Sequence, residues 1–402
     1  MKRIICAILL SAFSLHAHEL MFLANLKQAI KIDNQTYAHL IAQANNEPIN
    51  KDVQCSTSDR PLFKAYPALR QTISHISLGS FPTPLHRCDQ LTKVYDIQNL
   101  SIKQDSISGG ILSDDTRLFG GNKVRKLEFL LADAVYHNAQ SVLTFGCIGS
   151  NHATATATYA RELGFRCYLM LTPQPDSAIV HRNLNLMSAA NAEIIFSANA
   201  TMRMNATTST FIASKKDHGT YPYFIPTGGS TPIGVIGFVN AAFELREQIN
   251  NGLLTEPDYI YVATGSCGTT AGLALGLKAA GIRSQIIAVC VEPEEELGFF
   301  ERKIAQLFRE TNQLLNDRDA TFPLFGESVD NVMIVHDFSG PCYGLCMPEV
   351  IEAIEEIEKY ENVILDGTYT GKAFTAILSH AKQGLLQDKN VLFWNTFDGE
   401  VK

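Results

Sequence analysis

The stretch GGNKVRKLE, residues 120–128, places a lysine directly behind a pair of glycines. Apolar residues recur over the following turns at helical spacing, so the stretch predicts that Lys123 lies in the first turn of an amphipathic helix. Lys126 follows one turn later on the same face, and Arg125 is close by. Cationic neighbours and a helix N-terminus both disfavour an ammonium group, so we expect an unusually low pKa for Lys123. A neutral, positioned amine is what Schiff-base chemistry requires.

The alternative interpretation of residues 123–126 is a solvated basic turn, which is the usual meaning of three cations in four residues. Helix starts normally favour acidic side chains, however, and a solvated turn gives no reason for two preceding glycines. We therefore favour a reactive lysine.

The composition is that of an ordinary soluble enzyme. With 402 residues, 46% of them hydrophobic and 18% charged, the chain is long enough for one large domain or two medium ones. The formal net charge is -8 and basic residues form no long cluster, so we expect no nucleic-acid partner. No internal stretch is long and apolar enough to span a bilayer, so we expect no membrane span in the mature chain.

The N-terminus has the pattern of a secretory signal. A basic start at residues 1–3 precedes an apolar run at residues 4–15 and a cleavage point after Ala17. This pattern predicts a signal peptide at residues 1–17 and a periplasmic or secreted protein. The alternative is a helical extension that packs on the body of a cytoplasmic protein.

The nine cysteines do not decide between these compartments. Removal of Cys6 with a signal peptide would leave an even number, as an exported protein could have. Cys167 and Cys290, however, lie in apolar, strand-like runs where buried thiols are common, so we expect free thiols. Cys342 and Cys346 alone are too few for a structural zinc site, and we expect no metal.

From about Ser141 onward, short apolar runs alternate with helical stretches, which predicts an α/β fold with parallel sheets covered on both faces. There are more predicted strands than one simple sheet needs, so we expect two α/β units. The predicted strands are residues 141–145, 165–171, 193–196, 221–225, 258–263, 285–291, 331–335 and 390–394. The predicted helices include residues 152–163, 234–248, 269–280, 297–315, 348–360 and 371–386. Residues 18–75 lack this rhythm and are interpreted as an N-terminal extension.

Two further loops connect a predicted strand to a predicted helix. In ATGSCGTTAG, residues 263–272, the glycines let the backbone wrap an anion, and the N–H groups of the helix start supply positive potential. No Walker lysine follows, so a nucleotide P-loop is not indicated. In GCIGSNH, residues 146–152, Ser150 and Asn151 would be good N-cap residues without any function. Together with the lysine, however, these loops are what pyridoxal phosphate (PLP) needs, namely an amine for its aldehyde and a cradle for its phosphate.

These motifs resemble those of the fold-type-II PLP enzymes of the D-cysteine desulfhydrase and 1-aminocyclopropane-1-carboxylate (ACC) deaminase family. The resemblance covers roughly Leu78 to Thr396 and is carried by PTPL at 82–85, GGNKVRKLE at 120–128, GSNH at 149–152, PTGGS at 226–230, GSCGTTAGL at 265–273, GPCYGL at 340–345 and TYTGKA at 368–373. It implies two three-layer α/β domains with mainly parallel sheets and an active site in the cleft between them. The large PLP-binding domain would comprise residues 76–125 and 225–402, and the small domain residues 126–224. We also expect a homodimer.

The resemblance implies a role for each matched residue. Lys123 matches the Schiff-base lysine, Asn151 the contact to the phenolic oxygen of the cofactor, and Ser150 a serine that contacts the substrate. Tyr343 and Tyr369 match two active-site tyrosines, which completes the implied catalytic set. The implied phosphate contacts are Ser266, Cys267, Gly268 and Thr269, with Lys126 as a second contact.

The resemblance implies that Thr370 binds the cofactor by facing its pyridine nitrogen and that Thr396 lies near that nitrogen, and both positions bear on the substrate. The ACC deaminases of this family carry glutamate at the first position and leucine at the second, whereas the D-cysteine desulfhydrases carry threonine at both. A carboxylate that faces the pyridine nitrogen of the cofactor would make a stronger electron sink than a neutral hydroxyl. A threonine is enough when a thiolate leaves, whereas the opening of an unactivated cyclopropane ring needs more help.

The resemblance thus implies β-elimination from a small amino acid, most like the conversion of D-cysteine to pyruvate, sulfide and ammonia. ACC deamination and β-replacement are the alternatives among enzymes, and a non-catalytic PLP- or amino-acid-binding protein is the alternative outside them. The family usually reads His-Thr-Gly-Gly after its last strand, but residues 395–398 of this chain read Asn-Thr-Phe-Asp. Phe397 and Asp398 replace glycines that let the backbone approach the ring, which favours the non-catalytic alternative. The intact lysine, serine and tyrosines favour an enzyme.

Overall fold

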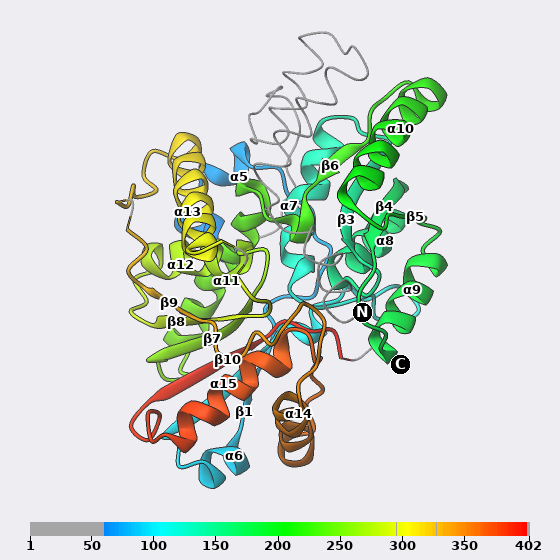
Figure 1. Cartoon of the computed structure of the whole chain (residues 1–402). Helices are drawn as coiled ribbons and strands as arrows, with labels where there is room; N and C mark the ends of the chain where they lie inside the picture. Colours follow the sequence, from blue (N-terminus) through cyan, green and yellow to red (C-terminus); the bar gives the residue numbers. More distant parts are fainter. Residues whose placement is uncertain (1–59, 295, 327, 400–402) are drawn as a thin grey trace.

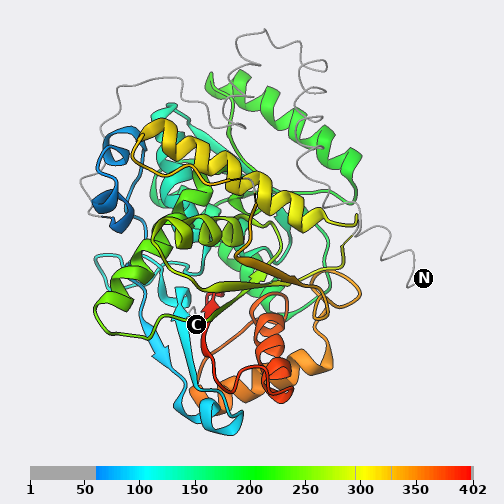
Figure 2. The same cartoon turned by 90° about the vertical axis from the view of Figure 1, so that its left-hand side faces the viewer.

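The computed structural model describes residues 60–294, 296–326 and 328–399. These residues form a six-stranded and a four-stranded β-sheet, and helices cover both faces of each sheet (Figures 1 and 2). The predicted α/β fold with two mainly parallel sheets is therefore confirmed. Each of the eight predicted strands is present, with bounds within two residues of the prediction.

The larger sheet has the strand order β1-β2-β10-β7-β8-β9. β1 is antiparallel to β2, whereas the other neighbouring strands run parallel. Since β10 lies between β2 and β7, the sheet combines early and late segments of the chain. The strands are β1 (Leu85–Arg87), β2 (Asn99–Gln104), β7 (Tyr259–Thr264), β8 (Gln285–Cys290), β9 (Val332–Val335) and β10 (Asn390–Asn395).

Alternate residues along these strands face two different helical layers, as the two-residue period of a strand requires. Ile260 and Val262 of β7 pack in a core with α11 (Pro232–Asn250), α12 (Gly268–Ala279) and α13 (Phe299–Arg318). Tyr261 and Ala263 of the same strand pack in a second core with α6 (Asp89–Val94), α14 (Pro348–Glu361) and α15 (Thr370–Lys382). The larger sheet is thus the middle of three layers.

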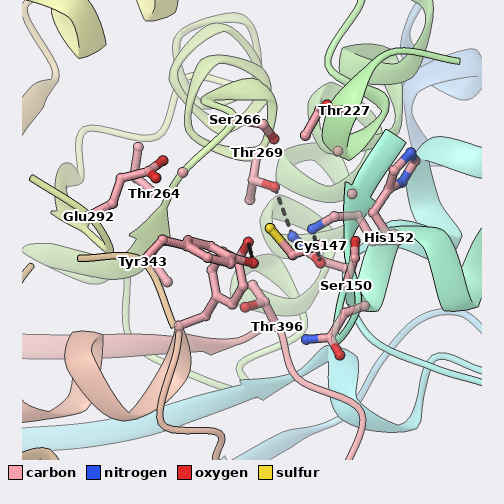
Figure 3. Close-up of a pocket in the computed structure, with 18 of the residues that line it drawn as sticks. Cys147, Ser150, His152, Thr227, Thr264, Ser266, Thr269, Glu292, Tyr343 and Thr396 are labelled. Carbon is pink, nitrogen blue, oxygen red and sulfur yellow. Dashed lines mark hydrogen bonds between the residues drawn. The ribbon is translucent and has the colours of Figure 1, made fainter. Parts of the chain in front are cut away.

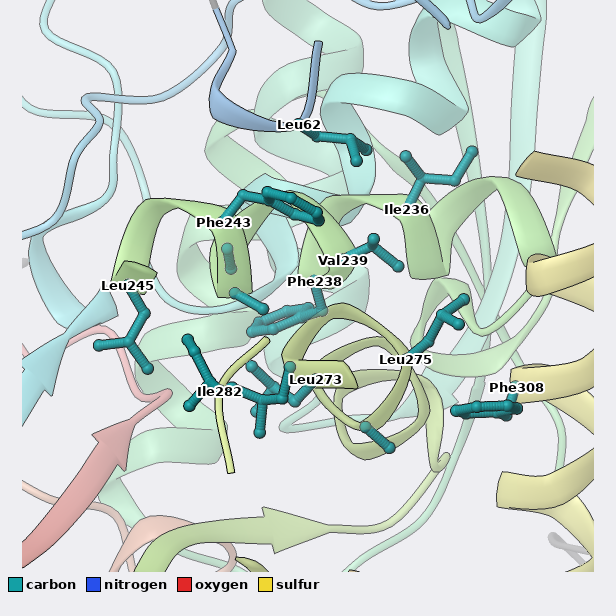
Figure 4. Packing of buried hydrophobic residues seen from close by; sticks show 14 of the residues in the cluster. Leu62, Ile236, Phe238, Val239, Phe243, Leu245, Leu273, Leu275, Ile282 and Phe308 are labelled. Atoms are coloured by element: carbon teal, nitrogen blue, oxygen red, sulfur yellow. The ribbon is translucent and has the colours of Figure 1, made fainter. Parts of the chain in front are cut away.

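The first of these cores also contains the beginning of the described chain. Figure 4 shows Leu62 above the side chains of α11, with Phe308 of α13 at the right-hand edge. Leu62 belongs to the short helix α4 (Pro61–Ala65), and the next helix, α5 (Leu69–Thr72), adds Leu69 to the same core. Residues 61–73 of the expected N-terminal extension are therefore packed against the large sheet's helices.

The smaller sheet is entirely parallel and has the order β5-β4-β3-β6. The strands are β3 (Ser141–Cys147), β4 (Arg166–Thr172), β5 (Glu193–Phe196) and β6 (Tyr223–Ile225). One face packs on α7 (Lys123–Tyr136), α8 (Asn151–Glu162) and α9 (Ala178–Ala189). The other face packs on α10 (Ala200–His218) through Phe211. This unit is a second three-layer arrangement.

Three further expectations concern the N-terminus, the cysteines and membrane-spanning helices. The expected signal peptide, residues 1–17, lies outside the described residues. Seven cysteines are described and all are free thiols, as expected. Within the described ranges, no helix combines the length and the apolar character that a membrane crossing requires.

Candidate active site

A cavity lies where the carboxyl ends of strands from both sheets meet the starts of the following helices (Figure 3). In parallel α/β sheets this edge is where ligands bind. The cavity encloses about 890 Å³ including its open mouth, which suits a cofactor together with a small substrate. Of the residues that the sequence assigns to a site, the cavity is lined by Lys123, Ser150, Asn151, Ser266, Cys267, Thr269, Tyr343, Tyr369 and Thr396.

The glycine pair positions Lys123 because two backbone segments can approach the glycines closely, just before the lysine. A Cβ on Gly120 would lie 2.4 Å from the carbonyl oxygen of Ser106, and one on Gly121 would lie 2.8 Å from that of Thr396. Gly121 also has a φ of +81°, which side chains rarely allow. The turn therefore requires glycine at both positions. Lys123 follows two residues after Gly121.

The Lys123 amine is hydrogen-bonded to its chain neighbour. Its Nζ donates to Oδ1 of Asn122 at 2.8 Å, and Nδ2 of Asn122 donates to Oγ1 of Thr269 at 3.0 Å. The backbone N–H of Asn122 in turn donates to the carbonyl oxygen of Thr396 at 3.1 Å. Asn122 thus ties the lysine to the glycine-rich loop and to the segment that follows β10.

The pKa of Lys123 is low, as expected, but for a different reason. Burial lowers it to about 8, while the charge of Asp366 opposes the shift. The expected cause was the cationic neighbours Arg125 and Lys126. The guanidinium of Arg125 is instead paired with Asp105 and Glu244 behind the helix, so its charge is neutralised there.

The glycine-rich loop forms a small cradle at the start of α12. A Cβ on Gly228 would lie 2.1 Å from Oγ of Ser266, and one on Gly268 would lie 2.5 Å from Oγ of Ser230. The same Cβ on Gly268 would lie 2.7 Å from Nζ of Lys126. Hydroxyls, a helix N-terminus and a lysine therefore converge on a space that exists only because these positions are glycine.

Lys126 fits an anion in this cradle. Its side chain is 1% exposed, and its Nζ donates to the carbonyl oxygen of Gly228 at 3.0 Å and to Oγ of Ser230 at 3.2 Å. Burial first and the charge of Lys123 second hold its pKa well below the ordinary value. A phosphate would restore the stabilisation that the ammonium lacks. The cradle and Lys126 would hold the phosphate of PLP, and Lys123 would bind its aldehyde.

The N-terminus of α8 presents three side chains to the cavity. Ser150 is the N-cap of α8, and its Oγ accepts a hydrogen bond from the backbone N–H of Ala153 at 3.2 Å. Asn151 accepts from Nδ2 of Asn183 at 2.9 Å, so the orientation of its amide is fixed. His152 is 3% exposed, and burial together with Lys123 and Lys126 keeps its pKa well below the ordinary value. The imidazole is therefore neutral.

Two tyrosines from separate segments form a hydroxyl pair in the cavity. The Oη atoms of Tyr343 and Tyr369 lie 2.7 Å apart, and Tyr343 faces the interior in Figure 3. Burial raises the pKa of both phenols, so both keep their protons across the neutral range. The ring centroid of Tyr369 lies 6.0 Å from Nζ of Lys123.

Thr370 is placed differently from the expectation. It does not line the cavity, and its Oγ1 donates to Oδ1 of Asp366 at 2.6 Å while accepting from the backbone N–H of Asp366 at 2.9 Å. Asp366, which is 1% exposed, lines the cavity instead. The cavity is thus lined at this position by the carboxylate of Asp366, which Thr370 supports by a hydrogen bond.

Phe397 and Asp398 are accommodated by an arginine of the smaller unit. Phe397 lines the cavity, and the guanidinium carbon of Arg182 lies 5.1 Å from its ring centroid. Nη1 of Arg182 also donates to the carbonyl oxygen of Asp398 at 2.8 Å. The wall that departs from the family pattern is therefore ordered and joins the two units.

Sequence reasoning missed three charged residues of the lining, Arg203, Glu292 and Asp366. Glu292 stands two residues beyond the carboxyl end of β8, so the rule for parallel sheets could have identified it. Arg203 comes from α10, which lies between two predicted strands but is not among the helices that the sequence analysis names. Asp366 lies in a loop four residues before α15, where an acidic side chain has no distinguishing local pattern.

Comparisons with known proteins identify the family of the chain. The family model described as pyridoxal-phosphate dependent enzyme matches residues 76–396. A relative from Pyrococcus furiosus, provisionally named 1-aminocyclopropane-1-carboxylate deaminase, is 31% identical over 331 residues, which cover 82% of this chain and 93% of that protein. A relative of the same provisional name from Thermotoga maritima is 31% identical over 325 residues, covering 80% and 95%.

Solved structures of similar proteins have the same fold. The structure of an ACC deaminase homologue has a TM-score of 0.70 at 28% identity and covers 85% of this chain and 96% of its own. A hydrogen sulfide-producing enzyme from Fusobacterium nucleatum shares the fold, with a TM-score of 0.55 at 15% identity over 81% of this chain and 95% of its own. The chain therefore belongs to the family of pyridoxal-phosphate dependent enzymes, with ACC deaminase homologues among its relatives, and its cofactor is PLP.

Proposed function

We propose that this enzyme removes the α-proton and the β-substituent of a small amino acid, and that D-cysteine is its substrate. The observation that carries the proposal is the Lys123 amine, which has a pKa of about 8 and lines the same cavity as the hydroxyl pair of Tyr343 and Tyr369. A base and a proton donor in one cavity are what an elimination needs.

The chain's own residues would divide the work as follows. PLP, when bound, supplies an electron sink for the electron pair left at the α-carbon. The neutral amine of Lys123 would take the α-proton. Oγ of Ser150 accepts from Ala153, so its O–H remains available to a substrate carboxylate at the N-terminus of α8. One hydroxyl of the tyrosine pair would give a proton to the departing thiolate.

The reaction balances without an oxidant or a reductant. The C–S bond breaks with its electron pair on sulfur, which leaves as hydrogen sulfide after protonation. The remaining aminoacrylate tautomerises and takes up one water, which gives pyruvate and ammonia. The cavity would therefore release three small products from one D-cysteine and one water.

The preference for D-cysteine over ACC rests on the resemblance at positions 370 and 396, where this chain carries threonine. Asp366 changes the physical argument, since a carboxylate lines the cavity although residue 370 is neutral. The remaining chemical argument is the leaving group, because a thiolate leaves readily whereas ACC has neither an α-proton nor such a group.

ACC deamination is the second candidate. The observation that favours it is the provisional name of the relatives from Pyrococcus furiosus and Thermotoga maritima, both 31% identical to this chain. A non-catalytic role is less well supported, since Lys123, Ser150 and both tyrosines share one cavity.

Keto-acid release from D-cysteine, L-cysteine and ACC at matched concentrations tests the proposal. We expect pyruvate from D-cysteine at the highest rate and little or no keto acid from ACC. Faster release from ACC would establish the second candidate. No release from any of the three, by protein that carries PLP, would favour the non-catalytic alternative.

We also propose that the protein is exported, because residues 1–17 have the pattern of a signal peptide. Mature protein from a periplasmic or secreted fraction would then begin near His18, which N-terminal sequencing can show. An intact Met1 on protein from the cytosolic fraction would refute export.

A further inference from the structure

Four charged side chains form a buried cluster at the start of the lysine helix α7, and none of them lines the cavity. They are two cations and two anions, and each is at most 2% exposed: Lys103, Asp105, Arg125 and Glu244. Their charges balance, which buried ions require. The cluster joins the lysine helix α7 to the helix α11 and to the 3-10 turn after β2, Asp105–Ile107.

Asp105 holds the chain on both sides of Lys123. Two residues before the lysine, the backbone N–H of Gly121 donates to the carbonyl oxygen of Asp105 at 2.9 Å. Two residues after it, Arg125 donates to both carboxylate oxygens of Asp105, from Nη2 at 2.8 Å and from Nε at 3.0 Å. Residues 121 and 125 are therefore bound to one partner, with the lysine between them.

Asp105 is itself fixed by neutral donors. Trp394 of β10 donates from Nε1 to Oδ2 at 2.8 Å, and Thr83 donates from Oγ1 to Oδ1 at 3.0 Å. β10 continues into Thr396, whose carbonyl oxygen binds the backbone N–H of Asn122. The same strand thus restrains Asp105 and the residue next to the lysine.

The guanidinium of Arg125 also reaches a second carboxylate. Nη1 and Nη2 donate to the two oxygens of Glu244 at 2.9 and 3.0 Å, and Lys103 approaches the same carboxylate at 2.5 Å. A planar fork of donors pairs with two carboxylates in a fixed geometry, whereas an ammonium is a compact point charge without that geometry. Lysine at position 125 would keep the charge and lose the geometry.

We infer that Arg125 is a positioning residue. It acts through Asp105 to hold the side chain of Lys123 in the buried position from which its amine would reach PLP. The inference rests on the proposed function, because it concerns the same lysine. Looser anchoring would let the Lys123 side chain reach more solvent. The pKa of its amine would then rise from about 8 towards the ordinary value, because burial is what lowers it.

The test uses the full-length apoprotein and PLP, without any amino-acid substrate. The rate of PLP attachment, followed by its absorbance change, is measured against pH for wild type and R125K. We expect the pH midpoint of R125K to rise by about one unit, so attachment below that midpoint becomes about tenfold slower. The groups that act on or lie near the amine, Asp366, Lys126, His152 and Tyr369, are the same in both proteins.

R60K is the matched control. Arg60 makes another buried ion pair to α7, from Nη1 to Oε2 of Glu128 at 2.6 Å, one turn beyond Arg125. R60K should lower the melting temperature as R125K does and leave the pH midpoint of PLP attachment unchanged. An unchanged midpoint in R125K, or an equal shift in both variants, would overturn the inference.

W394F and T83V keep the test decisive if R125K does not fold. W394F removes one neutral hydrogen bond to Asp105. T83V removes another, together with the hydroxyl that accepts from Nη2 of Arg125 at 2.9 Å. Both variants leave all four charges in place. We expect a smaller upward shift of the midpoint, with attachment two- to threefold slower, in both variants. No shift in either variant would overturn the inference. Wild type that attaches PLP but releases no keto acid would refute the proposed function alone.

Discussion

At the scale of single residues, the two lysines of the site differ in what their amines can reach. Lys123 lines the cavity, whereas Lys126 is bound to Gly228 and Ser230 in the cradle. We therefore expect borohydride reduction of the purified, yellow protein to attach the pyridoxyl group to Lys123. Peptide mass spectrometry identifies the labelled residue, and K123A should carry no label. Label on Lys126 would contradict the assignment.

The tyrosine pair leads to a second prediction at this scale. Y343F removes one hydroxyl that lines the cavity and leaves the ring in place, so a proton donor to the leaving group would be lost. We expect kcat to fall by about 10²-fold while PLP binding is unchanged, in line with the contribution of general acid catalysis. Steady-state rates and absorbance titration with PLP separate the two effects. Y369F serves as the companion variant, and normal turnover in both would exclude the hydroxyls from the reaction.

How far single residues can be predicted from sequence depends on where their partners lie. The glycine pair before Lys123 signals a close approach of backbone, and the structure shows it. The low pKa of the lysine follows from burial, which a local sequence does not display. The hydroxyl of Thr370 is committed to Asp366, a contact within one helix start that competes with any contact to a ligand.

At the scale of elements, the start of α12 is the feature most sensitive to change. Gly268 is its first residue, and a Cβ there would lie within 3 Å of both Ser230 and Lys126. We expect G268V to weaken PLP binding at least tenfold, about 1.4 kcal/mol, with a smaller effect on folding. Equilibrium titration with PLP gives the affinity and thermal denaturation of the apoprotein gives the stability. An unchanged affinity would mean that the loop serves packing alone.

β2 is an element that sequence reasoning missed because a distant partner completes its pattern. β2 carries Lys103 on a buried face, and a charged residue argues against a core strand. The charge is tolerated because Glu244 of α11 neutralises it, which no local pattern shows. The parallel strands β7, β8 and β10 were predicted because they are buried on both faces and are therefore largely apolar.

At the scale of the whole molecule, the buried charge cluster links stability to pH. Burial alone would raise the pKa of Glu244, but Arg125 and Lys103 outweigh it and lower the pKa from 4.5 to about 2. Glu244 therefore stabilises the fold above pH 4.5, by about 3 kcal/mol, and this contribution disappears as the pH falls towards 2. Urea denaturation of the apoprotein between pH 6 and pH 3 measures the loss.

E244Q is the informative variant for that measurement. Its amide does not titrate, so its free energy of unfolding should be lower at pH 6 and should fall less steeply with acid than that of wild type. E247Q, at a half-exposed position one helical turn further on α11, should follow the wild-type curve. Parallel curves for wild type and E244Q would contradict the role of this carboxylate.

The position of β10 between β2 and β7 has a consequence for biosynthesis. β2 is complete at Gln104, but its parallel neighbour begins at Asn390, so the ribosome must make most of the chain before the two can pair. At about 5–20 residues per second, β2 waits roughly 15–60 s with an open edge. The smaller unit, residues 141–225, can form its own sheet during that interval. Nascent chains that stall before residue 390 would expose this edge, and they are the species that chaperones must shield.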